Sequence, residues 1–433
     1  MEDKVFNPFK IFIFFGYITI LLISGCVHTS PDGRGSSATV STKILRGKVL
    51  KKSGINKTFI MEITEHGQKK SKTITYDRKT KGIDHVKNRK NIVVTCRTQK
   101  QTTHAIAISP ELEGFAEGVT EISAQRVQQN QKNKKSFTLI DARPLYNFQR
   151  SHIPDALSIP SCSIKSSASL PQDKKTFLIF YCDGPLCGQS IMASSFAVHA
   201  GYENVHVLKD GLTGWEQEGY PTVAEDSFVL HAKGVIIDIR PAKNDNVARI
   251  PGSVAIPLEV LAKKMKTIPH DAPVVVYGDT TRQSQKALNL LRAAGYHHPA
   301  MVKDNFKGWK KRGRATSQDT VDKHITWQHK TRRAEISPQT FTDVVSGKLK
   351  GIILDVRTPE ETKSGTMTGA LLIPLHNLYE QMQDLPQGQN IFVYSSNGSR
   401  AHLAATILES RGYIASYLAN DVVCQYGHCE VLF

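Results

Sequence analysis

The 433-residue sequence is poor in cysteine and in acidic residues. Its seven cysteines are too few for a disulfide scaffold of this length, so each has to be considered by itself. The 39 Asp and Glu are outnumbered by 56 Lys and Arg, and the formal net charge of +17 favours nucleic acid, an anionic membrane surface or an anionic substrate as a partner. With 40% hydrophobic and 22% charged residues, the chain is not disordered throughout, collagen-like or a polytopic membrane protein. The length predicts roughly two to four domains.

The apolar run at residues 11–25 is shorter than the roughly 20 residues that cross a bilayer. Lys4 and Lys10 flank its start and small residues end it, as in a secretory signal. Ile23-Ser24-Gly25-Cys26 resembles a bacterial lipobox, which implies lipidation of Cys26 after removal of residues 1–25, and residues 26–40 have the composition of a tether. We therefore expect a lipoprotein anchored to a membrane of the cell envelope and facing the periplasmic, extracytoplasmic side. A plain membrane anchor with an incidental cysteine is the alternative.

Residues 41–112 contain about five short runs in which apolar and polar residues alternate, which predicts a small all-β barrel or sandwich domain. Between Lys43 and Lys100 there are 17 Lys and Arg but four acidic residues. An OB-like domain that binds nucleic acid has such a charge, but export and the scarcity of aromatic residues argue against nucleic acid. We expect this domain to face anionic lipid headgroups, with a merely solvated basic surface as the alternative.

One segment recurs three times in the rest of the chain. Each copy has an Asp-x-Arg motif, and the distance from its Asp to the loop after a later apolar run is 41, 40 and 40 residues (Asp141 to Cys182, Asp238 to Gly278, Asp355 to Ser395). We assign the copies to residues 118–224, 226–316 and 333–433.

Each copy alternates short apolar runs with helical stretches such as residues 191–200, 285–294 and 401–410. This order predicts α/β domains with doubly wound parallel sheets, whose ligands bind at the carboxyl ends of the strands. The loop after Tyr181 is therefore the place to look for chemistry.

The motifs Asp141-Ala142-Arg143, His152-Ile153-Pro154-Asp155-Ala156, Tyr181-Cys182 and Asp210-Gly211-Leu212 resemble those of the rhodanese-like, or sulfurtransferase, domain family. The resemblance covers roughly residues 120–433 in three tandem copies. It implies a nucleophilic Cys182 that takes a sulfane sulfur from thiosulfate, a polysulfide or a persulfide and passes it to a thiol acceptor, with no cofactor. Supporting residues would be Asp141 and Arg143, and the loop residues that bind the anion or persulfide would be Asp183, Gly184, Leu186, Gly188, Gln189 and Ser190.

The position of Cys182 between a strand and a helix suits a reactive thiol, because a helix N-terminus and converging backbone N–H groups stabilise a thiolate. Gly184 and Gly188 allow the loop to curl, and Ser190 is placed to cap the following helix. A buried, inert cysteine is the alternative.

The loop of residues 182–190 departs from the common family pattern of Cys, four residues, Arg and Ser. It is about two residues longer, has Gln189 in place of the Arg and contains no cation. We expect poor use of thiosulfate and a wider pocket. Cys187 is a candidate resolving thiol that pairs with Cys182 or receives its persulfide; alternatively it only lines the pocket.

The other two copies lack the nucleophile, since Gly278 and Ser395 stand in its place. Gly398 and Arg400 predict that the third loop still binds an anion. A serine hydrolase built on Ser395 and Ser396 is disfavoured because no partnered His and Asp are visible.

Cys424 and Cys429 are spaced for a disulfide that closes the C-terminal tail. A metal site with His428 is a weaker alternative because only three ligands are local, and we predict no metal.

Together these features predict an exported, membrane-tethered sulfurtransferase or persulfide carrier. The alternatives are a non-catalytic protein that uses the rhodanese scaffold to bind anions, sulfur species or a partner, and an arsenate reductase or phosphatase-like enzyme.

Overall fold

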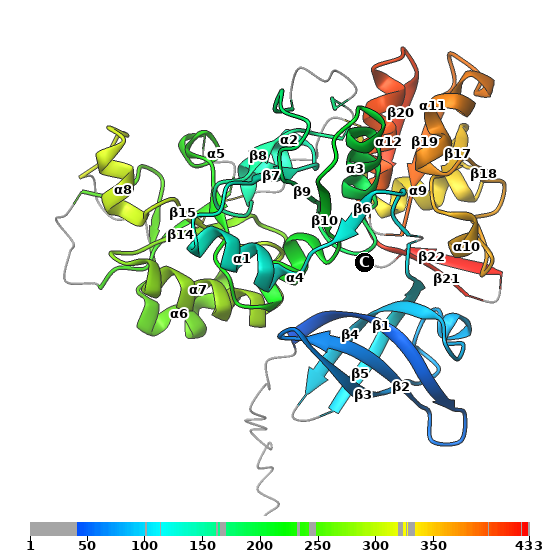
Figure 1. Cartoon of the computed structure of the whole chain (residues 1–433), viewed down its shortest axis with the longest axis horizontal. Coiled ribbons are helices and arrows are strands. Elements are labelled where there is room, and N and C mark those ends of the chain that lie inside the picture. The colour runs from blue at the N-terminus through cyan, green and yellow to red at the C-terminus, as the bar shows by residue number, and fades with distance from the viewer. Residues whose placement is uncertain are drawn as a thin grey trace, which may run out of the picture. The chain divides into compact units, whose positions relative to one another are not determined.

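The computed structural model describes residues 41–99, 102–112, 114–161, 163–164, 170–231, 234–241, 248–318, 324–325, 327, 334–396, 398–425 and 427–431. All of these belong to one compact unit, residues 39–433 (Figure 1). The predicted signal at residues 1–25, the lipidation site Cys26 and the tether at residues 26–40 lie outside the described residues. Within the described part of the chain, no helix has the length and apolar character needed to cross a membrane.

The first domain is a closed barrel with the strand order β1-β2-β3-β5-β4. Its neighbours pair antiparallel except β3 and β5, which are parallel at Thr75 and His104. Alternate residues of β2 point inward, so Phe59, Met61 and Ile63 are buried in the barrel core. The predicted small β domain is therefore present, as a barrel. Its strands are β1 (Ser41–Ser53), β2 (Thr58–Glu65), β3 (Gln68–Thr75), β4 (Asn91–Gln99) and β5 (Thr102–Pro110).

The first repeat, copy 1, is a five-stranded sheet in the order β6-β10-β9-β7-β8, and the neighbouring strands are parallel. The central strand β9 is buried along its whole length, because helices cover both faces of the sheet. Its elements are β6 (Val119–Glu121), α1 (Ala124–Lys132), β7 (Thr138–Asp141), α2 (Leu145–Arg150), β8 (Leu157–Ser158), β9 (Leu178–Tyr181), α3 (Gln189–His199), β10 (Val205–Leu208) and α4 (Gly211–Gln217).

Copy 2 repeats the same sheet in the order β11-β15-β14-β12-β13. Its first strand is Val223–Ala224, which pairs with β15. The predicted end of copy 1 at residue 224 is therefore two residues too late, because these residues supply the edge strand of the next sheet. The elements are β11 (Val223–Ala224), α5 (Asp226–Leu230), β12 (Val235–Asp238), β13 (Val254–Ala255), α6 (Leu258–Lys264), β14 (Val274–Tyr277), α7 (Thr281–Ala293), β15 (Ala300–Val302) and α8 (Asn305–Lys311).

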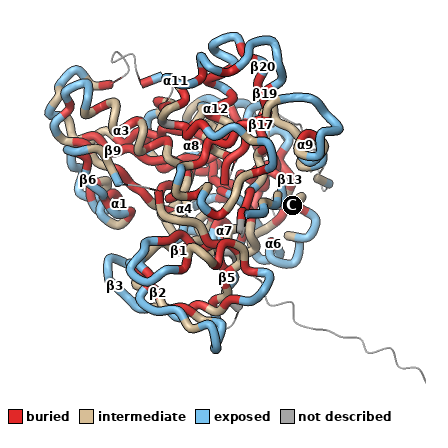
Figure 2. Tube along the Cα trace, turned by 90° about the vertical axis from the view of Figure 1, so that its right-hand side faces the viewer, coloured by how far each residue is buried: buried red, intermediate tan, exposed pale blue. Residues whose placement is uncertain are grey.

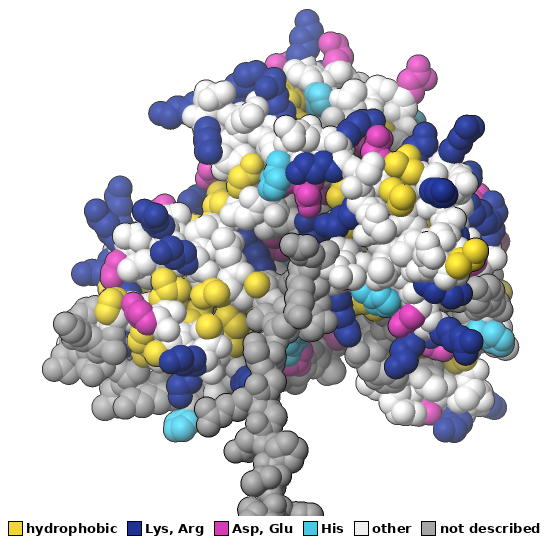
Figure 3. All heavy atoms as spheres, turned by 90° about the horizontal axis from the view of Figure 1, so that it is seen from below, with side chains coloured by type: hydrophobic (Ala, Val, Ile, Leu, Met, Phe, Trp, Pro, Cys, Tyr) yellow, Lys and Arg dark blue, Asp and Glu magenta, His cyan; other side chains and the backbone are white. Residues whose placement is uncertain are grey.

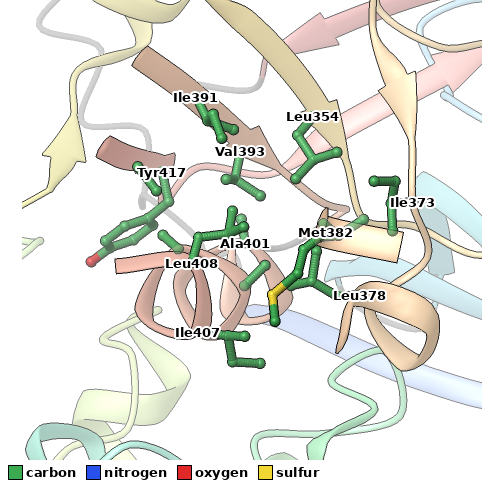
Figure 4. Close-up of a cluster of buried hydrophobic side chains, with 14 of the residues drawn as sticks. Leu354, Ile373, Leu378, Met382, Ile391, Val393, Ala401, Ile407, Leu408 and Tyr417 are labelled. Carbon is green, nitrogen blue, oxygen red and sulfur yellow. The ribbon is translucent and has the colours of Figure 1, made fainter. Parts of the chain in front are cut away.

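Copy 3 has the order β16-β20-β19-β17-β18 and adds the two-stranded hairpin β21–β22. One face of its sheet packs Leu354, Ile391 and Val393 against Ala401 and Leu408 of α12 (Figure 4). The elements are β16 (Glu335–Ile336), α9 (Pro338–Val345), β17 (Ile352–Asp355), α10 (Pro359–Thr362), β18 (Leu371–Leu372), α11 (Leu378–Gln381), β19 (Asn390–Tyr394), α12 (Ser399–Glu409), β20 (Ile414–Leu418), β21 (Val422–Gln425) and β22 (His428–Val431). The three sheets confirm the predicted doubly wound α/β fold, and buried segments run through their centres in Figure 2.

Candidate active site

Cys182 directly follows the central strand β9 of copy 1, at the carboxyl end of the sheet, where ligands of doubly wound folds bind. The loop of residues 182–188, the active loop, leads to Gly188, whose φ of 75° is the left-handed conformation that glycine tolerates best. Helix α3 begins at Gln189, so its N-terminal backbone faces the loop. Gly184 has a different role from the one predicted: a Cβ there would lie 3.3 Å from Oγ1 of Thr213, so a side chain would crowd α4.

The surroundings of Cys182 favour ionisation of its thiol. Its exposed fraction is 1%, and its Sγ lies 3.3 Å from Oγ of Ser190. Burial by itself disfavours the thiolate. Hydrogen bonds from Cys187 and from the side chain and backbone of Ser190 outweigh burial and hold the pKa of Cys182 below its ordinary value. Ser190 is therefore not the predicted helix cap: Gly188 takes that position, and the Ser190 hydroxyl turns to the sulfur instead.

Cys187 is a buried, free cysteine, like Cys182. Burial and the hydrogen bond to the neighbouring Cys182 sulfur raise its pKa well above the ordinary value. Its Sγ also lies 3.4 Å from Oε1 of Gln189. The two thiols are thus neighbours but unequal: Cys182 ionises first, and Cys187 keeps its proton.

Asp183, next to Cys182, has contacts from all three copies. Within copy 1, Nη1 of Arg143 lies 2.8 Å from its Oδ1. From copy 3, the hydroxyl of Ser399 donates to Oδ2 at 2.8 Å. From copy 2, Nε2 of His298 lies 3.6 Å from Oδ1. Although burial opposes it, the charges of Arg143 and His298 hold the pKa of Asp183 well below its usual range.

The predicted supporting pair Asp141 and Arg143 is buried at the end of β7. Nε of Arg143 donates to Oδ1 of Asp141 at 2.9 Å, and Nη2 donates to Oδ2 at 2.7 Å and to the carbonyl of Ser151 at 2.6 Å. The remaining guanidinium nitrogen of Arg143, Nη1, donates to Asp183. The Asp-x-Arg motif therefore holds the start of the active loop in place.

Copy 3 covers the active loop. Nε2 of Gln189 donates to the backbone carbonyl of Ser399 at 3.3 Å, and a Cβ on Gly188 would meet Cδ of Arg400 at 3.6 Å. With Cys182 almost completely buried, the longer loop does not form the predicted wider pocket in this conformation. Asp183 and Gln189 instead contact the other copies.

In copies 2 and 3, the residues that stand in place of Cys182 form hydrogen bonds within their own copy. In copy 2, the backbone N–H of Gly278 donates to Oδ1 of Asn305, and α7 starts at Thr281. In copy 3, the N–H of Ala401 donates to Oγ of Ser395. Arg400, which we predicted to bind an anion, instead forms two hydrogen bonds of 2.7 Å with the buried carboxylate of Glu361.

Three contact residues of the site were missed in the sequence: His298, its partner Glu216 on α4, and Ser399. Nδ1 of His298 lies 2.6 Å from Oε2 of Glu216. The local sequence does carry one signal. All three copies have Gly-Tyr at the same turn (Gly201, Gly295 and Gly412), and it is followed by two histidines in copy 2 alone.

Away from the loop, Cys424 and Cys429 form a disulfide between opposite positions of β21 and β22. The bond removes both sulfurs from the alternative metal site with His428. Within the described residues, no group of three or more His, Cys, Asp or Glu side chains is arranged to hold a metal ion. A cleft of about 420 Å³ lies between the barrel and copy 1, and Pro185 of the active loop lines it together with Arg46 and Asp210.

The geometry thus defines an α/β protein with one cysteine-bearing loop and two related domains without the cysteine. Residues 123–218, 227–312 and 339–423 match the rhodanese-like domain family, which is more than half of the chain. The chain belongs to this family, with three tandem copies of the domain.

Individual relatives are distant. A sulfurtransferase of Allochromatium vinosum is 27% identical over 79 residues, which is 18% of this chain and 74% of the relative. An HTH-type transcriptional regulator of Mycobacterium tuberculosis is 37% identical over 95 residues, or 22% of this chain and 40% of the regulator. Among solved structures, a thiosulfate sulfurtransferase from Pseudomonas aeruginosa is 19% identical with a TM-score of 0.24, covering 69% of this chain and 66% of that one.

Proposed function

We propose that this protein is a sulfurtransferase or persulfide carrier in which Cys182 is the nucleophile. The observation that carries the proposal is the pair of hydrogen bonds from Cys187 and Ser190 that favour the Cys182 thiolate at the head of α3. The thiolate attacks the outer sulfur of a persulfide donor, the S–S bond of the donor breaks, and the donor thiolate leaves. Cys182 then carries a persulfide, and an acceptor thiolate takes the outer sulfur and returns Cys182 to the thiolate.

The charges around the loop favour a donor other than thiosulfate. Of the cations near the loop, Arg143 is paired with Asp141 and Asp183, and Arg400 is paired with Glu361. We therefore propose a low-molecular-weight organic persulfide as the donor class.

Cys187 offers a second route for the bound sulfur, because its thiol contacts Cys182. Once deprotonated, Cys187 attacks the Cys182 sulfur of the persulfide. A Cys182–Cys187 disulfide forms, and the outer sulfur leaves as hydrosulfide with the electron pair. A dithiol reductant then restores both thiols. In this route Cys187 is a resolving thiol and sulfide is the product.

The test is transfer of sulfur to cyanide from thiosulfate, from polysulfide and from glutathione persulfide. We expect glutathione persulfide to react at least about tenfold faster than thiosulfate, and Cys182→Ser to abolish transfer from every donor. Cys96→Ser is the control, since Cys96 is a buried thiol in the barrel whose pKa burial raises to about 11. Activity that survives Cys182→Ser would overturn the proposal.

A separate measurement addresses the resolving step. With glutathione persulfide alone, the wild-type protein should release sulfide and form the disulfide. Cys187→Ser should instead retain one extra sulfur atom on Cys182, detected by intact-mass spectrometry. Equal sulfide release by both proteins would exclude Cys187 as the resolving thiol.

We also propose that the protein is exported and anchored to a membrane through Cys26, with the barrel facing the lipid headgroups. The tip of the β1–β2 hairpin supports this orientation: Ile55 is 95% exposed there, and Lys51, Lys52 and Lys57 flank it in the sequence. An apolar residue within a basic patch suits an anionic bilayer surface. Lys and Arg side chains are numerous on the face drawn in Figure 3.

Two experiments test the membrane proposal. Palmitate labelling in cells should be lost in Cys26→Ala. In that unlipidated background, binding to phosphatidylglycerol vesicles, measured by flotation, should weaken at least about thirtyfold on Lys51→Glu with Lys57→Glu, since each lysine near the surface contributes about 1 kcal/mol. Lys263→Glu with Lys264→Glu on α6 is the matched charge control and should have no effect. Equal binding by both double variants would refute the orientation.

A further inference from the structure

Copy 2 has no nucleophile, yet it places an imidazole against the active loop of copy 1. His298 lies in the turn between α7 and β15, with φ of 48°, and its side chain is 6% exposed. Its Nδ1 is 2.6 Å from Oε2 of Glu216, and its Nε2 is 3.6 Å from Oδ1 of Asp183. Among the described residues, the buried Nε2 has no hydrogen-bond partner. Asp183 is therefore the group that this nitrogen faces.

Both groups that face His298 are carboxylates. Despite their burial, the pKa values of Asp183 and Glu216 are lowered, chiefly by Arg143 and His298 for the first and by His298 for the second, so both groups are ionised. A neutral imidazole has one N–H and cannot donate to two carboxylates, whereas an imidazolium donates from both nitrogens.

The other charged side chains near the ring contact one of these two carboxylates or the backbone of His297. Arg143 pairs with Asp183, and Arg292 of α7 lies 3.4 Å from Glu216. Arg150 of α2 contacts the backbone of His297. The neighbouring His298 and burial push the pKa of His297 well below its usual value, so His297 is neutral.

We propose that His298 is a positioning residue for the Cys182 nucleophile: its imidazolium offsets the charge of Asp183, so that copy 2 sets the reactivity of the thiol in copy 1. The inference rests on the proposed function only in taking Cys182 as the nucleophile. The physical reason is electrostatic. The carboxylate of Asp183 disfavours a second negative charge on the adjacent Cys182, and a cation on Asp183 relieves that repulsion.

The test uses the full chain and follows alkylation of Cys182 by iodoacetamide as a function of pH, read by fragment-ion mass spectrometry that separates Cys182 from Cys187. His298→Gln keeps a donor for Glu216 but removes the charge. We expect it to raise the pH midpoint of alkylation and to slow the reaction below that midpoint about threefold to tenfold. His297→Gln, in the same turn, removes no charge and should leave the midpoint unchanged.

Two further variants separate the electrostatic role from a merely structural one. In an Asp183→Asn background, His298→Gln should no longer move the midpoint, because the charge that it offsets is gone. Glu216→Gln should shift the midpoint in the same direction as His298→Gln, since it removes the carboxylate that helps to keep the ring charged. An unchanged midpoint in His298→Gln, or an equal shift in the Asp183→Asn background, would overturn the inference. Alkylation needs no sulfur donor, so failure of sulfur transfer leaves this test intact.

Discussion

The two thiols of the active loop are five residues apart in sequence, and their surroundings shift their pKa values in opposite directions. Cys182 accepts hydrogen bonds from Ser190 and Cys187, whereas Cys187 is buried beside a sulfur that ionises first. The difference arises from Gly188: its left-handed φ ends the loop so that Ser190 lies in the first turn of α3, next to the sulfur. A single hydroxyl group is therefore expected to carry a measurable part of the reactivity of Cys182.

Ser190→Ala should slow alkylation of Cys182 about tenfold at pH values below the midpoint. Loss of a hydrogen bond to the thiolate raises the pKa of Cys182, which leaves less thiolate at a given pH, and about one pKa unit corresponds to one hydrogen bond to a charged group. Ser194→Ala is the matched control because Ser194 donates to the carbonyl of Ile191 within the same helix. If the two variants behave alike, Ser190 does not stabilise the thiolate.

Among the elements, the helices of copy 3 are tied together by a buried ion pair. Glu361 on α10 accepts two hydrogen bonds from Arg400 on α12 and one from Ser396, and it also accepts from the backbone N–H of Thr358. These bonds hold the pKa of Glu361 at about 2 in spite of burial. In this copy, the arginine of the former active loop has become a structural residue.

Glu361→Gln should destabilise copy 3 by about 3–5 kcal/mol at neutral pH, because it leaves Arg400 buried without a counter-charge. The pKa of Glu361 is depressed in the folded state, so its contribution is present above about pH 4.5 and is lost as the pH falls toward about 2. The difference between wild type and variant should therefore shrink across that window.

Hydrogen exchange of α12 (Ser399–Glu409) in a urea series measures this difference. Glu360→Gln is the control, since Glu360 is exposed and pairs with Lys363 on the surface. A pH-independent difference between wild type and Glu361→Gln would contradict the assignment of the buried ion pair.

The hairpin β21–β22 depends on its covalent link. A two-stranded hairpin is marginally stable by itself in water, and a disulfide that closes a loop this short contributes roughly 2 kcal/mol in the chain-entropy model. Cys424→Ser with Cys429→Ser should therefore speed hydrogen exchange in residues 422–431 by roughly thirtyfold, while β19 and β17 stay protected. Equal exchange in β19 would show that the hairpin and the sheet unfold together.

At the scale of the whole molecule, the sequence predicts the features that lie within one copy but not the contacts between copies. The constant spacing from Asp141 to Cys182 locates the cysteine-bearing loop, because strand, loop and helix follow one another in the chain. The contacts of Asp183 with His298 and Ser399 could not be predicted, since nothing in either segment indicates which turn of another copy it meets. The loop length was interpreted as a wider pocket for the same reason: the residues that fill that space come from copy 3.

The contact between copies 1 and 3 yields a prediction about access. Ser399→Ala removes the hydroxyl that donates to Asp183, so copy 3 should separate from the active loop more often. At a pH above the midpoint, where Cys182 is ionised in both proteins, alkylation should become about fivefold faster, since one hydrogen bond to a charged group contributes at least about 1 kcal/mol. Thr406→Ala, which is exposed on α12, should leave the rate unchanged. No acceleration in Ser399→Ala would mean that copy 3 does not limit access.

In the function proposed above, the burial of Cys182 also bears on how long a persulfide on its sulfur survives. A persulfide is readily oxidised and readily attacked by stray thiols, and both reactions require the reagent to reach the sulfur. A nucleophile with an exposed fraction of 1% is shielded between openings of the loop, so the sulfur is lost slowly to solvent oxidants. The same shielding slows loading. A protein built in this way is suited to keeping sulfur and releasing it on contact with a partner, rather than to rapid turnover of a dissolved substrate.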